Sequence, residues 1–144
     1  MPTQNQSPGL PTARDRYDSW LLALEPVFAH DLKQKFKEMA GEPVDVLRAT
    51  FYRWSERLAD DVYLEVISAP AVRAVGDVHV GNFGTWPRGQ GRVRWSLIDF
   101  DEADWIPFTN DLVLRATSAL LARSDLDPQL VGRQILSGYV DHRY

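Results

Sequence analysis

The hydrophobic pattern of the chain changes twice along its length, and this change most constrains the fold. In residues 44–60 apolar side chains recur at helical spacing. Residues 62–68 and 71–75 are rich in β-branched side chains, and residues 92–100 alternate apolar and polar, as strands do. Helical spacing returns in residues 110–124. We therefore predict an α+β fold that is mostly helical.

Capping and breaking residues predict where the helices begin and end. Asp18 or Ser19 is expected to cap a first helix, which Pro26 ends or restarts. A second helix then runs to Gly41.

The helices after the strands have their own signals. Asn110 or Asp111 is expected to cap the next helix, and Asp127 caps the last one, with Pro128 in its first turn. The last helix reaches Tyr144 without a stop signal, so we expect the natural domain to be longer. "WPRGQG" before residue 92 supplies a hairpin turn.

Length and composition limit the class of protein. Residues 1–16 are rich in Pro, Gln, Ser and Thr and are expected to form a disordered leader, which leaves a single domain over 17–144. The net charge of −4 argues against general nucleic-acid binding but not against a nucleotide, because a metal can supply positive charge. With no secretory signal and no long apolar segment, the expected location is the cytoplasm, without membrane attachment. The absence of cysteine excludes disulfides and thiolate zinc sites.

Two polar clusters stand at the ends of predicted strands, "GDVHVGNFG" over 76–84 and "LIDFDEADW" over 97–105. Asp77 and Asn82 are five positions apart, the interval of the protein-kinase catalytic loop. In that loop the Asp accepts the proton of the attacking hydroxyl and the Asn binds magnesium. Asp99-Phe100 follows a predicted strand as the kinase Asp-Phe-Gly does, although Asp101 replaces the Gly. A hairpin between the clusters can bring the two loops together.

These motifs carry a resemblance to known families. "GDVHVGN", "LIDFDEAD" and "NDL" are similar to the motifs of aminoglycoside and choline phosphotransferase-like kinases. More closely, "KEMAGEPVDVLRATFY", "GDVHVGNFG" and "IDFDEADWIPFTNDLVLRATSAL" resemble the family called domain of unknown function 2252, over about residues 30–123. The resemblance is to the N-terminal part of that family only, and it implies a fragment similar to the catalytic-loop lobe of a protein-kinase-like fold, with a small β-hairpin.

The resemblance also implies a role for each matching residue. Asp77 would be the catalytic base, and Asn82 and Asp99 would hold the magnesium of ATP or another nucleoside triphosphate. His79 and Asp111 would support the loop. Asp101 and Glu102 are possible additional acidic site residues. The phosphoryl acceptor, a small molecule or a protein, is not specified by these motifs.

The chain departs from the kinase pattern in several places. Val75 stands where phosphotransferase kinases usually have His, and Ala49 stands where the closer family tends to have Gly. No glycine-rich phosphate loop and no strand-borne lysine precede the motifs. We therefore expect an incomplete phosphotransferase segment with weak nucleotide binding and little turnover.

Other functions compete with this interpretation. A metallophosphatase needs several His ligands, but the chain has only His30, His79 and His142. A Ser-His-Asp hydrolase would need a Gly-x-Ser-x-Gly elbow, which is absent. A non-catalytic kinase-like remnant is the main alternative, and its tryptophans near the loops would form either core or an interaction surface: Trp86, Trp95 and Trp105.

Overall fold

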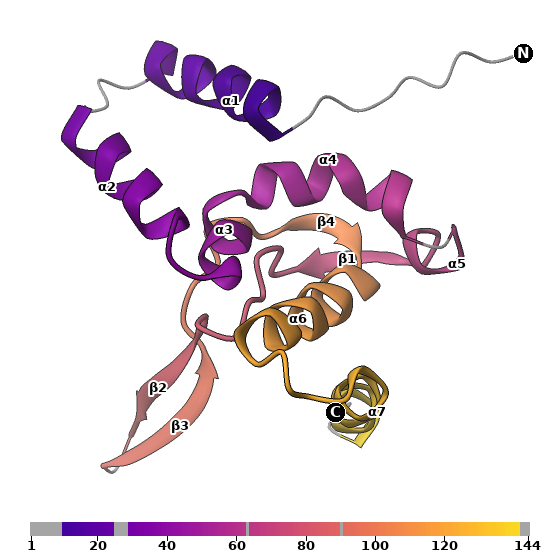
Figure 1. Ribbon diagram of the computed structural model, residues 1–144. Coiled ribbons are helices and arrows are strands. Elements are labelled where there is room, and N and C mark those ends of the chain that lie inside the picture. The colour runs from indigo at the N-terminus through magenta and orange to yellow at the C-terminus, as the bar shows by residue number, and fades with distance from the viewer. Residues whose placement is uncertain (1–9, 25–28, 63, 90, 142–144) are drawn as a thin grey trace, which may run out of the picture. The chain divides into compact units, whose positions relative to one another are not determined.

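A computed structural model describes residues 10–24, 29–62, 64–89 and 91–141 (Figure 1). It divides the chain into two compact units, Met1–Tyr63 and Leu64–Tyr144. In the described residues the first unit is helical, and the second combines helices with two antiparallel ribbons. The predicted α+β class is confirmed. The single domain predicted over 17–144 spans both of these units.

The first unit contains α1 (Leu10–Leu24), α2 (Ala29–Met39), α3 (Pro43–Ala49) and α4 (Phe51–Asp61). Helix α1 packs on α4, where Tyr17 and Tyr52 stack with ring centroids 4.1 Å apart.

The start of α1 corrects two predictions. Residues 10–16 are helical and do not belong to a disordered leader, while residues 1–9 lie outside the described residues. Asp18 and Ser19 do not cap this helix, because it begins at Leu10 and both lie inside it. The Ser19 hydroxyl instead donates to the Asp15 carbonyl one turn earlier. Pro26 lies outside the described residues.

The single helix predicted over 44–60 is two helices, because Thr50 interrupts it. Thr50 has φ −132° and ψ 37°, and its hydroxyl donates to the Val46 carbonyl at 2.6 Å. Its own carbonyl then accepts the N–H groups of Arg53 and Trp54, which starts α4. The periodicity is uninterrupted in the sequence, so the break comes from this local hydrogen bonding.

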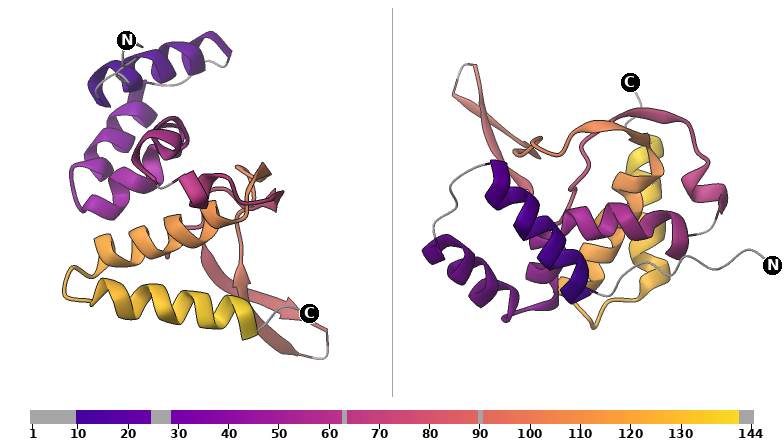
Figure 2. Two further views of the ribbon diagram at one scale, coloured as in Figure 1. Left: turned by 90° about the vertical axis from the view of Figure 1, so that its right-hand side faces the viewer. Right: turned by 90° about the horizontal axis from the view of Figure 1, so that it is seen from above.

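The second unit contains two ribbons and three helices among its described residues. Strand β1 (Ala71–Ala74) pairs with β4 (Asp104–Pro107), and β2 (Phe83–Arg88) pairs with β3 (Arg92–Leu97). The helices are α5 (Leu64–Ile67), α6 (Thr109–Ala122) and α7 (Pro128–Asp141). Helices α6 and α7 pack together, as the left-hand view of Figure 2 shows.

One predicted strand is absent from the described residues, and two strands were not predicted. The strand expected over 62–68 contains the short helix α5, which packs on α6. Strands β1 and β3 are confirmed, but β2 extends through residues expected to form the turn, as far as Arg88. Strand β4 was not predicted, because it is short, follows a run of acidic residues and ends in Pro107.

The caps of the two long helices differ. Helix α6 begins at Thr109, so neither Asn110 nor Asp111 is its N-cap, and no side chain caps it. Helix α7 agrees with its prediction, since the Asp127 carboxylate accepts the Gln129 N–H at 3.0 Å.

The buried residues of the second unit gather around the loop after β1. Ala74, Val78 and Leu114 are buried there. They are accompanied by four buried polar residues that belong to this loop or face it: His79, Asn82, Asn110 and Ser118. The polar loop is therefore part of the core of its unit.

The tryptophans near the loops are exposed, which contradicts the interpretation of them as core. Trp86, Trp95 and Trp105 have 49%, 67% and 66% of their surface exposed. Two of them lie on the β2–β3 hairpin, which extends away from α6 in Figure 1 and in the right-hand view of Figure 2. Among the described residues, no helix has the length and apolar character to cross a bilayer.

Candidate active site

The loop that carries Asp77 leaves β1 through a glycine with a left-handed backbone. Gly76 has φ +88°, a conformation that side chains disfavour. A Cβ atom at this position would overlap the backbone carbonyl of Glu102. A glycine at this point therefore allows the loop to contact the acidic run directly.

Helix α6 holds the start of this loop by its first turn. The Asp111 carboxylate accepts the N–H groups of Val75 and Gly76, at 2.8 and 3.1 Å. The neighbouring Asn110 amide donates to the Gly76 carbonyl and to Asp111, both at 3.0 Å. Charge-assisted bonds of this kind are stronger than neutral ones, so the loop is fixed to the helix.

A second attachment to α6 comes from Ser118, which no sequence motif indicated. Its fully buried hydroxyl accepts the Val80 N–H at 3.1 Å and donates to the Arg115 carbonyl at 2.9 Å. The only signal in the sequence is its position seven residues after Asp111, on the same helical face. Arg115 itself lies over the ring of Phe83, 4.4 Å from its centroid.

Asn82 joins the two polar loops. Its amide nitrogen donates to the carbonyls of Asp77 and Asp99, each at 3.0 Å. Its backbone carbonyl also accepts the Ile98 N–H at 3.2 Å. The remaining amide oxygen, Oδ1, is buried and accepts no hydrogen bond from the described residues. Asn82 is thus a structural link with one polar atom still available.

His79 lies beside Asp77 in the same loop. Its Nδ1 accepts the Gly81 N–H at 3.1 Å, so the neutral imidazole carries its proton on Nε2. Nε2 is 3.7 Å from Oδ2 of Asp77. His79 is only 7% exposed, and its ring is therefore held by the loop backbone on one side and faces the carboxylate on the other.

The acidic run meets the loop through its backbone more than through its side chains. One oxygen of the Asp99 carboxylate accepts the Asp101 N–H at 3.2 Å. Asp99, Asp101 and Glu102 are all exposed. The described residues include no group of three or more acidic, His or Cys side chains arranged to hold a metal.

The structure therefore brings some of the expected residues together and leaves others apart. The backbones of Asp77 and Asp99 meet at Asn82. Asp111 contacts the loop from behind, through backbone N–H groups. Asp101 and Glu102 have exposed side chains, although the backbone of Glu102 lies against Gly76.

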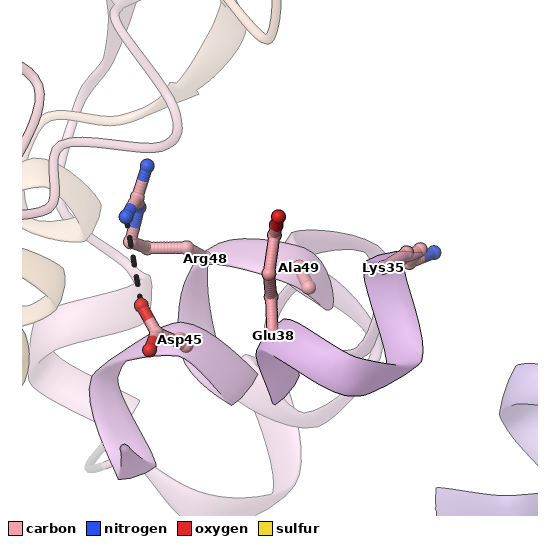
Figure 3. A pocket seen from close by; sticks show the side chains of 5 residues that line it. All are labelled: Lys35, Glu38, Asp45, Arg48 and Ala49. Atoms are coloured by element: carbon pink, nitrogen blue, oxygen red, sulfur yellow. Dashed lines mark ion pairs between the residues drawn. The ribbon is translucent and has the colours of Figure 1, made fainter. Parts of the chain in front are cut away.

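The first unit has a separate hollow of about 190 Å³ between α2 and α3 (Figure 3). Asp45 and Arg48 form an ion pair of 3.5 Å on one side, and Lys35 and Glu38 complete the polar lining. Its charges balance, so it has no clear preference for an anion or a cation.

Comparisons with known proteins place the chain in a family. No curated protein and no solved structure matches the sequence. One family model, described as "Uncharacterized protein conserved in bacteria (DUF2252)", matches residues 28–133. The matched region contains the loop of Asp77, the acidic run and α6, and it covers well over half of the chain. The chain therefore belongs to the DUF2252 family of proteins conserved in bacteria.

Proposed function

We propose that the second unit carries the metal-and-base part of a kinase-like phosphotransferase, corresponding to the catalytic-loop lobe of a protein-kinase-like fold and acting in the cytoplasm. The observation that carries this proposal is the arrangement at Asn82. Its amide nitrogen binds both polar loops, while its amide oxygen is buried without a partner among the described residues. A buried oxygen of this kind is costly unless something binds it.

The donor atoms near this oxygen suit magnesium. Mg²⁺ prefers oxygen ligands and keeps several waters, so it needs only one or two carboxylates from the protein. Asn82 Oδ1 and the Asp99 carboxylate would hold it, which requires no cluster of three acidic side chains. When bound, Mg²⁺ supplies positive charge to the phosphates of ATP or another nucleoside triphosphate.

In this proposal Asp77 is the general base. Its carboxylate would accept the proton of the acceptor hydroxyl, on a small molecule or a protein. His79 Nε2, 3.7 Å away, would keep that carboxylate oriented. Asp111, Asn110 and Ser118 hold the loop backbone from α6, so the base is carried on a rigid support.

The test is calorimetry with Mg-ATP on the chain and three variants. We expect weak binding that Asp99→Asn abolishes and that Asp77→Asn retains, because the base acts on the acceptor. Asp104→Asn is the matched control, an exposed carboxylate of the same acidic run whose Oδ1 accepts the adjacent Trp105 N–H. Binding that Asp99→Asn and Asp104→Asn reduce equally would contradict the assignment of Asp99.

Turnover is the second readout. We expect little release of γ-phosphate, because no glycine-rich loop precedes the motifs to orient the phosphates. Any turnover should disappear in Asp77→Asn. Robust turnover that Asp77→Asn leaves unchanged would show that the chemistry is assigned wrongly.

The alternative is a non-catalytic kinase-like protein that acts through binding. One observation favours it: the exposed tryptophans on the hairpin next to the site. Failure of Mg-ATP to bind at all would favour this alternative.

A further inference from the structure

The β2–β3 hairpin has two chemically different faces. Directly paired residues share a face, so Thr85, Pro87, Val93 and Trp95 lie on one side. The opposite face carries four residues in two cross-strand pairs: Trp86 with Arg94, and Arg88 with Arg92. Val93 and Trp95 are 71% and 67% exposed, so the apolar face is largely uncovered.

The basic face lacks counter-charges. No acidic residue lies between Phe83 and Leu97 in the sequence. No ion pair joins a described carboxylate to Arg88, Arg92 or Arg94. Arg88 and Arg92 also face each other across the strands, and like charges in that position destabilise a ribbon. The hairpin therefore presents concentrated positive charge in a chain whose net charge is −4.

One edge of this hairpin is suited to accept another strand. Among the described residues β3 pairs only with β2, so the outer edge of β3 has no strand partner. The edge of β2 contains Pro87, which has no N–H and protects an edge from pairing. Strand β3 contains no proline. A two-stranded ribbon is also marginally stable alone and gains from a third strand.

We infer that the outer edge of β3 receives an extended segment of a partner protein in which acidic and apolar residues alternate. Along β3 the sequence Arg92-Val93-Arg94-Trp95 alternates between the basic face and the apolar face. An added strand has the same period of two, so its acidic side chains would meet the arginines while its apolar ones cover Val93 and Trp95. One occupant thus satisfies both faces and the backbone edge.

Other occupants fit less well. A second copy of the chain pairing through β3 would place arginines against arginines. A nucleic acid would be repelled by the acidic run that begins at Asp99, directly after the hairpin, and would leave Val93 and Trp95 uncovered. An anionic bilayer could contact the basic face or the apolar face, but these are opposite. The inference is independent of phosphoryl transfer.

The experiment measures binding of labelled peptides to the full chain by fluorescence anisotropy. The probe is a peptide in which glutamate and valine alternate over the length of β3. A peptide of the same composition with its glutamates and valines in separate blocks is the first control, and the alternating peptide with a central proline is the second. We expect the alternating peptide to bind at least about tenfold more tightly than either control.

Variants of the chain locate the site. Arg92→Glu with Arg94→Glu should weaken binding about tenfold or more, because like charges then face each other. Lys33→Glu with Lys37→Glu changes the net charge equally on exposed positions of α2 and should leave binding unchanged. Val93→Thr with Trp95→Thr keeps residues that favour strands and should also weaken binding.

Several results would overturn the inference. Equal binding of the block peptide would mean that charge alone is recognised. If the alternating peptide fails while a single-stranded oligonucleotide, an anionic vesicle or a second copy of the chain binds through the arginines, that occupant replaces the one inferred. Loss of binding in the lysine variant would place the site elsewhere.

Discussion

At the scale of single residues, Asn82 and Asn110 form a natural pair for comparison. Both are buried amides whose nitrogen donates to a loop carbonyl, but only Asn82 keeps a buried oxygen without a partner in the described residues. Asn82→Asp removes the donor and places a carboxylate against two carbonyls, so we expect a loss of about 1–3 kcal/mol in the free energy of unfolding. Asn110→Asp should cost more, because the new carboxylate also faces the carboxylate of Asp111.

Magnesium distinguishes the two substitutions. If the proposed metal site is correct, saturating Mg²⁺ should restore stability to Asn82→Asp and leave Asn110→Asp unchanged. Urea unfolding with and without Mg²⁺ measures this difference. Rescue of both variants, or of neither, would contradict a magnesium site at Asn82.

Asp111 is expected to matter for stability, because its carboxylate accepts two backbone N–H groups of the loop. Asp111→Ala should lower the free energy of unfolding by roughly 1.5–3 kcal/mol, the usual range for bonds to a charged group. The control is Asp125→Ala, which removes an exposed carboxylate paired with Arg123. Equal melting temperatures for Asp111→Ala and the wild type would show that these bonds contribute nothing.

Tyr52 predicts a dependence on alkaline pH. Burial, and next the negative charge of Asp18, raise the pKa of Tyr52, whose hydroxyl has no hydrogen-bond partner among the described residues. A raised pKa in the folded state gives stability that is complete below the unfolded value, about 10, and is lost as pH rises through the folded value. In Tyr52→Phe the free energy of unfolding should therefore fall less steeply with pH above about 10 than in the wild type. Thermal melts across this pH range measure the difference. An unchanged slope would contradict this.

At the scale of elements, the glycines of the second unit predict a graded series. Gly76 has φ +88° and no room for a Cβ, Gly91 has φ +72° in open space, and Gly89 has neither constraint. Gly91→Ala should cost roughly 1–2 kcal/mol from backbone strain alone. Gly76→Ala should cost clearly more, because the loop must move away from Glu102. Gly89→Ala, which meets neither constraint, should cost least. Chemical denaturation of the three alanine variants checks this order. Equal losses for Gly76→Ala and Gly91→Ala would show that the close approach to Glu102 is unimportant.

The elements that the sequence predicted are those with strong local signals. Helices α6 and α7 and strands β1 and β3 have clear periodicity. Strand β2 was not predicted, because Pro87 and the neighbouring glycines are typical of a turn. Pro87 is tolerated here because β2 is an edge strand, where a missing N–H costs little. The segment of α5 was predicted as a strand because it is rich in β-branched residues. Its contact with α6 accompanies the helical conformation, and no local sequence pattern reveals that contact.

The candidate site follows the same division. Asp77, Asn82 and Asp99 were predicted as site residues from the spacing within two motifs, and the structure brings the two loops that carry them together at Asn82. Ser118 was not found, because a serine inside a helix becomes informative only when the loop packs against it. The N-cap predicted at Asn110 or Asp111 failed for a related reason, since both side chains bind the loop in preference to their own helix.

At the scale of the whole molecule, the net charge hides an uneven distribution. The hairpin carries only positive charges, and the run that begins at Asp99 carries only negative ones. Near the sequence pI of about 5.3 the net repulsion between molecules disappears. Association through exposed apolar side chains, among them Val93 and Trp95, is then opposed by less electrostatic repulsion.

We therefore expect light scattering to pass through a maximum near pH 5.3. Two variants should change this maximum in different ways. Arg92→Glu with Arg94→Glu lowers the pI and should move the maximum to lower pH. Val93→Thr with Trp95→Thr leaves the charge unchanged and should lower the maximum without moving it, because the exposed apolar face is reduced. If the threonine variant scatters as strongly as the wild type, the apolar surface that drives association does not lie on β3. That result would contradict the hairpin edge as a place where other chains bind.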